Sequence, residues 1–449
     1  MNKNPKFNFK FSSFIKFIVP SLIGILLFMT PVKIDGNFTI PIAFLSNLLV
    51  ESLGNILPLL AVIVISISAI GSIIIKIFRT ENKILNSLFN VTPIWLIGRI
   101  LGMIIVILSY LRLGPEFIWS DSTGGMVLFS LLPALISIFL FAGLFLPLLL
   151  NHGLLEFVGS MLTKVMRPIF NLPGRSSIDC ITSWLGDGTI GILLTGKQYE
   201  EGFYTKKEAS IIGTSFSAVS ITFSLMVITQ VGLGHMFVPF YLTVTFAGII
   251  AAIIVPRIPP LSKKSNTYID GSTPRKDAEV IPEGYTSLSY GLEKALEKAE
   301  DNSSIKLFFT DGIKNVVDMW LGVLPIVMAM GGIAVIIAEY TPIFQILGMP
   351  FIPFLKLLGI PEAAAASQTL IVGFADMFIP SVLAANITSE MTRFIIACVS
   401  VTQLIYMSEV GGLLLGSKIP VKFTDLIIIF LERTIITLPV IVLCANIIF

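Results

Sequence analysis

The chain has 449 residues, of which 55% are hydrophobic and 13% charged, with a net charge of +2 and a mean hydropathy of +0.91. Soluble globular domains carry about 25% charged residues, so this composition excludes a soluble domain and indicates a polytopic membrane protein. The basic residues are scattered in loops and form no stripe or recognised module, so nucleic acid is not an expected partner.

A helix that crosses a membrane needs about 20 mainly apolar residues. The continuous candidates, in chain order, are Phe14–Val32, Ile56–Phe78, Thr92–Leu111, Val127–Leu150, Ala209–Val231, Met236–Val255, Val316–Tyr340, Arg393–Leu415 and Thr424–Ile448. Two further apolar segments, Ile178–Leu194 and Ala363–Ala385, are interrupted near their middle. Phe38–Leu49 and Phe344–Leu358 are too short to span. The first candidate follows a basic start but lacks a small-x-small cleavage site, so we interpret it as a span.

The distribution of basic residues predicts the orientation. With a cytoplasmic N-terminus and two re-entrant broken segments, twenty-four of the 30 Lys and Arg residues fall on the cytoplasmic side and four on the outside. The positive-inside rule supports this arrangement, and we expect a multi-pass protein of the bacterial cytoplasmic membrane. Val127–Leu150 and Val316–Tyr340 then run in opposite directions, with Leu132-Pro133 and Leu324-Pro325 at equivalent points. Such an inverted repeat is typical of secondary transporters.

The sequence therefore divides into an N-terminal transmembrane region (1–125), a first repeat (126–256), a cytoplasmic linker (257–315) and a second repeat (316–449). The linker is rich in proline and then shows a narrow apolar stripe over Ser287–Asp301, which predicts an amphipathic helix. This helix either belongs to a simple connection or forms a regulatory or partner-binding element.

The two interruptions are the strongest candidates for a functional site. They read Gly186-Asp187-Gly188 and Gly373-Phe374-Ala375-Asp376. Unpaired backbone groups cannot face lipid, so a broken helix is tolerated only against protein or a polar cavity. A carboxylate at that depth is costly unless it has a function or a partner. Asp187 and Asp376 are thus expected to contact a ligand; the alternative is that they cap helices or lie in shallow loops.

Polar residues also follow each interruption. Thr214 and Ser217 lie three residues apart and share one helical face, and Gln403 and Tyr406 have the same spacing. Hydroxyls in membrane helices also serve simply to hold helices together. With Glu409 and two polar residues of the second broken segment added, the predicted substrate-binding residues are Asp187, Thr214, Ser217, Gln368, Thr369, Asp376, Gln403 and Glu409.

Catalytic and metal-binding patterns are missing from the sequence. It contains no His-Glu-x-x-His or Gly-x-Ser-x-Gly motif, and His152 and His235 lie at segment ends. The three cysteines sit in apolar runs and are interpreted as small buried hydrophobes. Arg99 and Arg433 are expected to pair with carboxylates for structural reasons. We expect neither an enzyme nor a cofactor, apart from a coupling ion.

The paired broken segments, Asn171-Leu172-Pro173-Gly174 to Gly188 and Gly359-Ile360-Pro361 to Asp376, resemble the Gate ("nucleoside recognition") domain. Concentrative nucleoside transporters, the ferrous-iron permease and spore-maturation membrane proteins share that domain. The N-terminal stretches 16–24 and 35–42 look like the YjiH-like branch of these proteins.

The resemblance implies two inverted Gate halves, each with a re-entrant hairpin, around a central site. In the nucleoside transporters, residues at the hairpin tips and in the helices that follow hold the substrate and a coupling sodium ion. The matching positions here are the eight predicted residues, with Na⁺ expected near Asp187 and Asp376. The first hairpin lacks a Gln-Thr-Glu triplet, so the resemblance does not carry over the nucleoside substrate.

The sequence therefore predicts a secondary-active transporter for a small polar or charged solute, coupled to H⁺ or Na⁺, that works by alternating access around the paired broken helices. The alternative is a non-transporting membrane subunit that acts with a partner Gate-domain protein. The expected partners are the solute, the lipid bilayer, and a second Gate subunit or further copies of this chain.

Overall fold

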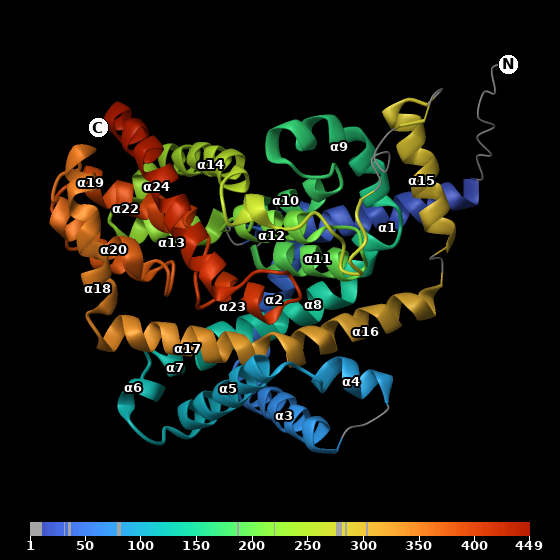
Figure 1. Cartoon of the computed structure of the whole chain (residues 1–449), viewed down its shortest axis with the longest axis horizontal. Coiled ribbons are helices and arrows are strands. Elements are labelled where there is room, and N and C mark those ends of the chain that lie inside the picture. The colour runs from blue at the N-terminus through green and yellow to red at the C-terminus, as the bar shows by residue number, and fades with distance from the viewer. Residues whose placement is uncertain are drawn as a thin grey trace.

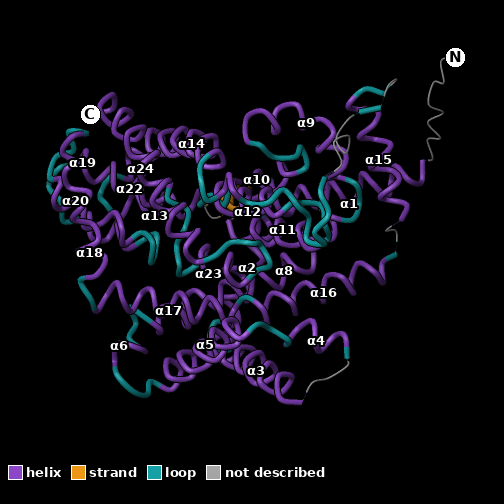
Figure 2. Tube along the Cα trace, in the orientation of Figure 1, coloured by secondary structure: helices purple, strands orange, loops and turns teal. Residues whose placement is uncertain are grey.

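The computed structural model describes residues 11–30, 32–34, 37–78, 82–185, 188–219, 221–274, 281–282, 285–301 and 304–449. Helices dominate this part of the chain, which also has one antiparallel hairpin of β1 (Val32–Ile34) and β2 (Asn37–Thr39), drawn in orange in Figure 2. Within the described residues, seven helices are long and apolar enough to cross a membrane. The predicted class, an all-α polytopic membrane protein, is confirmed.

The N-terminal region contributes five helices, of which the last three form a layer of their own (Figure 1). It contains α1 (Phe11–Met29), α2 (Pro41–Leu53), α3 (Leu57–Phe78), α4 (Lys83–Phe89) and α5 (Pro93–Leu111). Prolines open α2 and α5, where a missing N–H costs no helical hydrogen bond. In Figure 1, α3, α4 and α5 lie below a long helical rod, and α5 packs along that rod.

Two apolar rods of 35 residues each, Glu116–Leu150 and Lys306–Tyr340, form the centre of the molecule. The first consists of α6 (Glu116–Trp119), α7 (Gly124–Met126), a π-helical turn (Val127–Leu131) and α8 (Leu132–Leu150). The second consists of α16 (Ile305–Gly322) and α17 (Leu324–Tyr340). Pro133 and Pro325 occupy the first turn of α8 and α17, and α16 packs on α8. Both rods therefore change geometry at the Leu-Pro pairs that the sequence singled out.

The helices that follow each rod come in the same order: short helices, a helical hairpin, an interrupted helix and a long helix. After α8 these are α9 (Leu154–Phe170), α10 (Ser176–Leu185), α11 (Gly188–Glu200), α12 (Lys206–Ser215), α13 (Ile221–Gln230) and α14 (Phe237–Ile254). After α17 they are α18 (Ile343–Gly348), α19 (Ile352–Leu357), α20 (Ala363–Val372), α21 (Ile379–Ala384), α22 (Glu390–Thr402), α23 (Val410–Gly416) and α24 (Phe423–Ile448). Opposite orientation of the two halves stays a prediction.

Two predicted spans are wrong. Ala209–Val231 and Arg393–Leu415 are not continuous spans, because α12 ends at Ser215 and α22 ends at Thr402. The break between α22 and α23 contains Leu404 at φ 62°, a left-handed conformation that ends the regular helical hydrogen bonding. In addition, α16 begins at Ile305, inside the predicted linker, because helical spacing of apolar residues continues upstream of residue 316.

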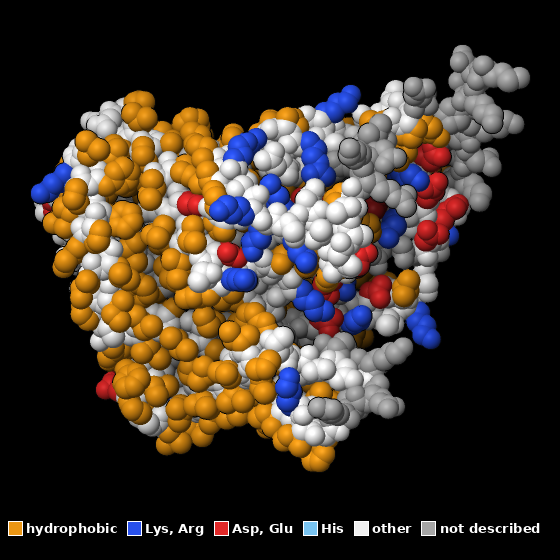
Figure 3. Space-filling view, viewed as in Figure 1, with side chains coloured by type: hydrophobic (Ala, Val, Ile, Leu, Met, Phe, Trp, Pro, Cys, Tyr) orange, Lys and Arg blue, Asp and Glu red, His pale blue; other side chains and the backbone are white. Residues whose placement is uncertain are grey.

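The amphipathic helix of the linker is α15 (Ser287–Asp301), at the predicted position. Its apolar stripe packs against α1 and α9, where Ala295 and Ala299 are fully buried beside Phe17. The C-terminal part of this stripe is therefore covered within the chain, whereas Leu288 near its start is exposed. On the face seen in Figure 3, charged side chains gather over the end that carries α9 and α15, while hydrophobic side chains dominate the rest.

The contact between α5 and α17 provides a first test of the fold. A Cβ atom added at Gly102 would lie 2.2 Å from the backbone oxygen of Pro325, so no side-chain movement relieves the clash. We expect Gly102→Ala to lower the free energy of unfolding by about 2 kcal/mol or more. Thermal unfolding of the purified protein measures this. Gly322→Ala is the control, because an added Cβ meets nothing within 4 Å there; equal melting of the two variants would contradict the α5–α17 packing.

Candidate functional site

The start of α11, in the first hairpin, lies against the break after α12. Helices α10 and α11 approach so closely that a Cβ atom at Gly191 would fall 1.6 Å from Ser183 Oγ. A Cβ atom at Gly188, the first residue of α11, would lie 2.9 Å from the carbonyl oxygen of Ala218 and 3.0 Å from that of Ser217. Gly186 and Asp187 lie outside the described residues, so the prediction for Asp187 stays a prediction.

A buried polar cluster holds the two arms of this hairpin together. The carboxylate of Asp179, on α10, is fully buried and accepts hydrogen bonds from Thr195 Oγ1 (2.9 Å) and Gln198 Nε2 (2.6 Å) on α11. Gln198 Oε1 accepts from Arg175 Nε at 2.8 Å, and the Arg175 guanidinium stacks on Phe203 at 3.7 Å from the ring centre. The sequence analysis missed Asp179, although a second carboxylate beside Asp187 in the apolar segment 178–194 was a visible signal.

The second hairpin binds the break between α22 and α23 through three hydrogen bonds around its tip, and a fourth lies within the hairpin. The carbonyl oxygens of Phe374 and Ala375 accept from the backbone N–H groups of Met407 (2.8 Å) and Ser408 (2.9 Å). Asp376 Oδ2 accepts from Ser408 Oγ at 2.8 Å. Asp376 Oδ1 accepts from Phe378 N at 2.8 Å, at the start of α21. Asp376 thus both holds the turn that precedes α21 and joins the hairpin to the broken helix.

Gln403, the residue that follows α22, contacts the same hairpin, and its side-chain oxygen has no hydrogen-bond donor. Its Nε2 donates to Leu370 O and to Thr434 Oγ1, both at 2.9 Å. This amide assignment is firm because Leu370 O can only accept and Thr434 Oγ1 already donates to Phe430 O. Gln403 Oε1 is buried without a hydrogen-bond partner, and a Cβ at Gly373 would lie 2.1 Å from it. The tip therefore presents one buried polar oxygen that has no protein donor.

The remaining predicted residues are placed differently. Thr214, Ser217 and Thr369 are buried, and their hydroxyls donate to backbone oxygens three or four residues earlier in the chain. Gln368 is exposed on α20, and Glu409 is half-buried at the start of α23. The structure thus joins Asp376 and Gln403 at one interruption and leaves Thr214 and Ser217 at the other.

The helix breaks after α12 and after α22 both contribute to the wall of one cavity of about 470 Å³. Its lining residues include Ser215, Phe216, Ala218 and Val219 at the break after α12, and Val401, Thr402 and Leu404 at the break after α22. Helices α10 and α14 complete the wall together with Arg433 of α24. Of the predicted site residues that the structure describes, none is in this lining. The neighbours of Thr214, Ser217 and Gln403 in the sequence line the cavity instead.

The expected pairing of the buried arginines with carboxylates is wrong. Arg99 donates from Nη1 to Ser72 Oγ (2.7 Å) and Leu88 O (3.1 Å). Arg433 is 1% exposed, donates from Nε to Thr402 O (2.9 Å), and leaves a buried Nη1 without a partner. Neither forms an ion pair with an Asp or Glu in the described part of the chain. Interruption of α22 frees the Thr402 carbonyl for Arg433, which the sequence did not predict.

No cluster of three His, Cys, Asp or Glu side chains that would suit a metal ion occurs among the described residues. The freed carbonyl groups and the Asp376 carboxylate are oxygen ligands, the kind that Na⁺ prefers over nitrogen or sulfur. The predicted sodium site near Asp376 stays a prediction.

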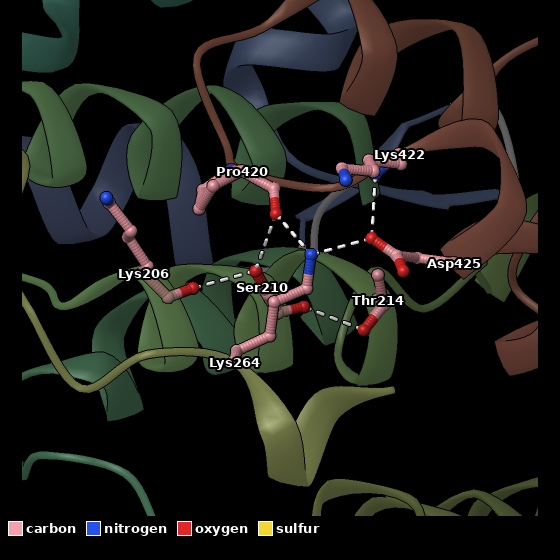
Figure 4. Close-up of polar contacts among 7 residues, drawn as sticks. All are labelled: Lys206, Ser210, Thr214, Lys264, Pro420, Lys422 and Asp425. Carbon is pink, nitrogen blue, oxygen red and sulfur yellow. Dashed lines mark hydrogen bonds and ion pairs between the residues drawn. The ribbon is translucent and has the colours of Figure 1, made fainter. Parts of the chain in front are cut away.

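The start of the linker ties α12 to α24 close to the first interruption (Figure 4). Lys264 Nζ donates to Pro420 O and to Asp425 Oδ2, both at 2.6 Å. Ser210 Oγ donates to Lys206 O (2.7 Å) and lies 3.4 Å from Pro420 O, and Thr214 donates to Ser210 O. The linker therefore connects the two halves by a specific ion pair as well as by the chain itself.

We expect Lys264→Met to destabilise the protein by about 1 kcal/mol, because the Asp425 carboxylate and the Pro420 carbonyl would lose a charged donor. The Lys264 and Asp425 side chains are only 17% and 14% exposed, so solvent screens their interaction little. Thermal unfolding checks the result, with Lys263→Met as the control because Lys263 is exposed. A Lys264 variant as stable as the Lys263 variant would show that the ion pair contributes nothing.

Comparison with known proteins agrees with this architecture. The Gate model, described as nucleoside recognition, matches residues 132–234, from the start of α8 to the loop before α14. The chain is also 51% identical over 439 residues to an uncharacterized protein of Alkalihalophilus pseudofirmus, with 97% of this chain and 95% of that protein covered. The chain belongs to the Gate (nucleoside recognition) family and is a transporter-like, multi-pass membrane protein.

Proposed function

We propose that the chain is a secondary-active transporter for a small polar or charged solute. The observation that carries this proposal is the contact of each hairpin with the break in the helix that follows it, through Gly188 in the first and Phe374 and Ala375 in the second. Interrupted helices are energetically tolerable inside a membrane protein where the freed backbone groups meet protein or line a cavity. Transporters use such half-helices to bind substrates and ions. A signalling or purely structural protein has no need for two of them at one cavity.

The transport cycle follows from the hydrogen bonds at the second hairpin. Movement of the hairpin away from α22 and α23 exposes the Phe374 and Ala375 carbonyls, the Asp376 carboxylate and the Gln403 oxygen together. A proton or Na⁺ that binds these oxygens replaces the lost donors. The first hairpin, with Asp187, is proposed to act in the same way from the opposite side, as the inverted repeat requires.

We place the chain in the bacterial cytoplasmic membrane with a cytoplasmic N-terminus. Supporting this orientation, the described N-terminal helix α1 lies at the end of the molecule where charged side chains gather (Figures 1 and 3). A second Gate subunit or further copies of the chain are the proposed protein partners. We expect no enzymatic activity, since the proposed role of the acidic residues is to bind an ion.

Uptake into proteoliposomes tests the function. The purified chain is reconstituted alone and screened with labelled nucleosides, amino acids, dipeptides and organic anions, under an inward Na⁺ gradient or a pH gradient. We expect gradient-dependent accumulation of at least one solute, with Asp376→Asn and Glu409→Gln reduced. No accumulation by the chain alone, combined with co-purification of a second membrane subunit, would instead favour the non-transporting alternative.

A further inference from the structure

The cavity between the two interruptions has an almost wholly apolar wall with one charged group in it. Its lining includes Phe170, Ile181, Trp184, Phe216, Val244 and Ile249. Arg433 is the one charged residue in that lining. The volume of about 470 Å³ lies within the range of small-molecule sites, about 300–1,000 Å³.

Arg433 lies near the middle of α24, a helix long and apolar enough to cross a membrane. It follows Phe423, the first residue of α24, by ten positions, which corresponds to about 15 Å of helix or half of the apolar core of a bilayer. A guanidinium has five N–H donors and remains protonated in proteins. Such a charge at this depth is costly unless donors and charge are both compensated.

The protein compensates Arg433 only in part. Nε donates to Thr402 O, but Nη1 is buried without an acceptor. Glu432, its neighbour in the sequence, does not pair with it, and within the described residues no carboxylate oxygen lies within 4.0 Å of the guanidinium. Arg99, which is equally buried, differs because its Nη1 donates to two protein oxygens. The unused donor and charge of Arg433 therefore call for an anion from outside the chain.

The apolar residues at the edge of the cavity favour a ligand whose remaining part is apolar. Ile181 and Ile249, both in the lining, are 39% and 38% exposed, so the entrance is itself apolar. A small hydrated anion gains nothing from such a wall, whereas an apolar chain or ring does. An anionic head bound to the guanidinium and an apolar body in the cavity satisfy both features.

We propose that this cavity is a binding site for an amphipathic organic anion, whose carboxylate or phosphate pairs with Arg433 while its hydrocarbon part fills the space beside α14. The site does not depend on the proposed transport function, because occupancy is measured apart from uptake. The same chemistry is offered by a free fatty-acid-like amphiphile and by the head and chain of an anionic membrane lipid.

Equilibrium binding tests the proposal. The full chain is placed in nanodiscs of phosphatidylcholine, and binding of radiolabelled decanoate is measured with unlabelled decanoate, decanol or decyltrimethylammonium as competitor. We expect saturable decanoate binding, competition by decanol at least roughly tenfold weaker, as for loss of a hydrogen bond to a charged group, and no competition by the cation. Equal competition by decanol would overturn the proposal, because hydrophobicity alone would then explain binding.

Variants separate the charge from the cavity. Arg433→Gln is expected to bind decanoate at least roughly tenfold more weakly, and Arg433→Lys to retain part of the affinity. Arg99→Gln, the matched control, is expected to bind like the wild type. Equal losses in the Arg99 and Arg433 variants, or no loss in Arg433→Gln, would refute the site.

A third variant keeps Arg433 and fills the cavity. At Gly248 the nearest atom to an added Cβ is Cζ2 of Trp184 at 3.9 Å, an ordinary van der Waals contact, and we expect the leucine of Gly248→Leu to extend into the cavity that Gly248 lines. We expect this variant to fold and to lose decanoate binding, which decides the question even if Arg433→Gln does not fold. Normal decanoate binding by Gly248→Leu would overturn the proposal.

Adding phosphatidylglycerol to the nanodiscs distinguishes the two sources of the anion. Displacement of decanoate by phosphatidylglycerol identifies the occupant as a membrane lipid. Undiminished decanoate binding in its presence identifies a free amphiphile. Both results require the anion site and assign its natural ligand to different pools.

Discussion

Replacing Asp376 by alanine is expected to reduce solute uptake roughly 100-fold, equivalent to about 2.7 kcal/mol. Its carboxylate helps to join the second hairpin to the broken helix, through Ser408 Oγ at 2.8 Å, and also accepts from Phe378 N in the turn before α21. Hydrogen bonds to a charged group contribute about 1.5–3 kcal/mol each, and the same carboxylate is the proposed ion ligand. Initial rates in proteoliposomes, normalised to the amount of reconstituted protein, measure the effect.

Two further variants separate the docking role of Asp376 from its charge. Ser408→Ala removes one hydrogen bond and leaves the carboxylate, so we expect roughly a tenfold loss. Asp376→Asn keeps an acceptor for Phe378 N but removes the charge, so we expect a folded protein whose uptake no longer responds to the ion gradient. Gradient-dependent uptake at the wild-type rate by Asp376→Asn would eliminate the coupling role.

Replacing Asp179 by alanine is expected to lower the free energy of unfolding by about 3–4 kcal/mol. The Thr195 hydroxyl and the Gln198 amide, both fully buried, would lose their acceptor, and each unsatisfied buried donor costs about 1–3 kcal/mol. The loss of side-chain volume adds a cavity between α10 and α11. Thermal and denaturant unfolding of the purified protein measure the change.

Thr182→Val on the same helix is the matched control. Thr182 is also fully buried, but its Oγ1 has no hydrogen-bond partner, so a methyl group of similar size is expected to leave stability unchanged or raised. Asp179→Asn retains an acceptor and is expected to fall between wild type and Asp179→Ala. An Asp179→Ala protein that melts with the wild type would show that the cluster does not hold the hairpin.

The sequence analysis succeeded where a feature is local. The apolar runs gave the long helices, and α10 ends at Leu185 while α11 begins at Gly188, on either side of the two residues of the Gly-Asp-Gly motif that lie outside the described residues. The linker helix Ser287–Asp301 was located from its apolar stripe alone. Such features depend on the spacing of apolar and helix-breaking residues within one segment, which the sequence records directly.

The sequence analysis missed the helix breaks after α12 and after α22 for a physical reason. Residues 209–231 and 393–415 contain no proline or other strong breaker at the point where the helix stops. What interrupts α22 is its contact with a segment about 30 residues away, since Met407 and Ser408 donate to the Phe374 and Ala375 carbonyls. A helix gives up its own hydrogen bonds only where others are available, and the sequence of one segment does not show what another supplies.

The sequence alone determined that this is a helical membrane protein with two broken segments, because the membrane requires long apolar runs and penalises every departure from them. It also pointed to Asp376, since a carboxylate in such a run is costly enough to stand out. Only the tertiary structure decided which polar groups meet. It joined Asp376 to Ser408 and left Gln368 exposed. It also placed Arg433, which we expected to pair with a carboxylate, in the wall of an apolar cavity, where no carboxylate of the described residues pairs with it. Those outcomes depend on packing between distant helices, which fixes where each unpaired donor or acceptor lies.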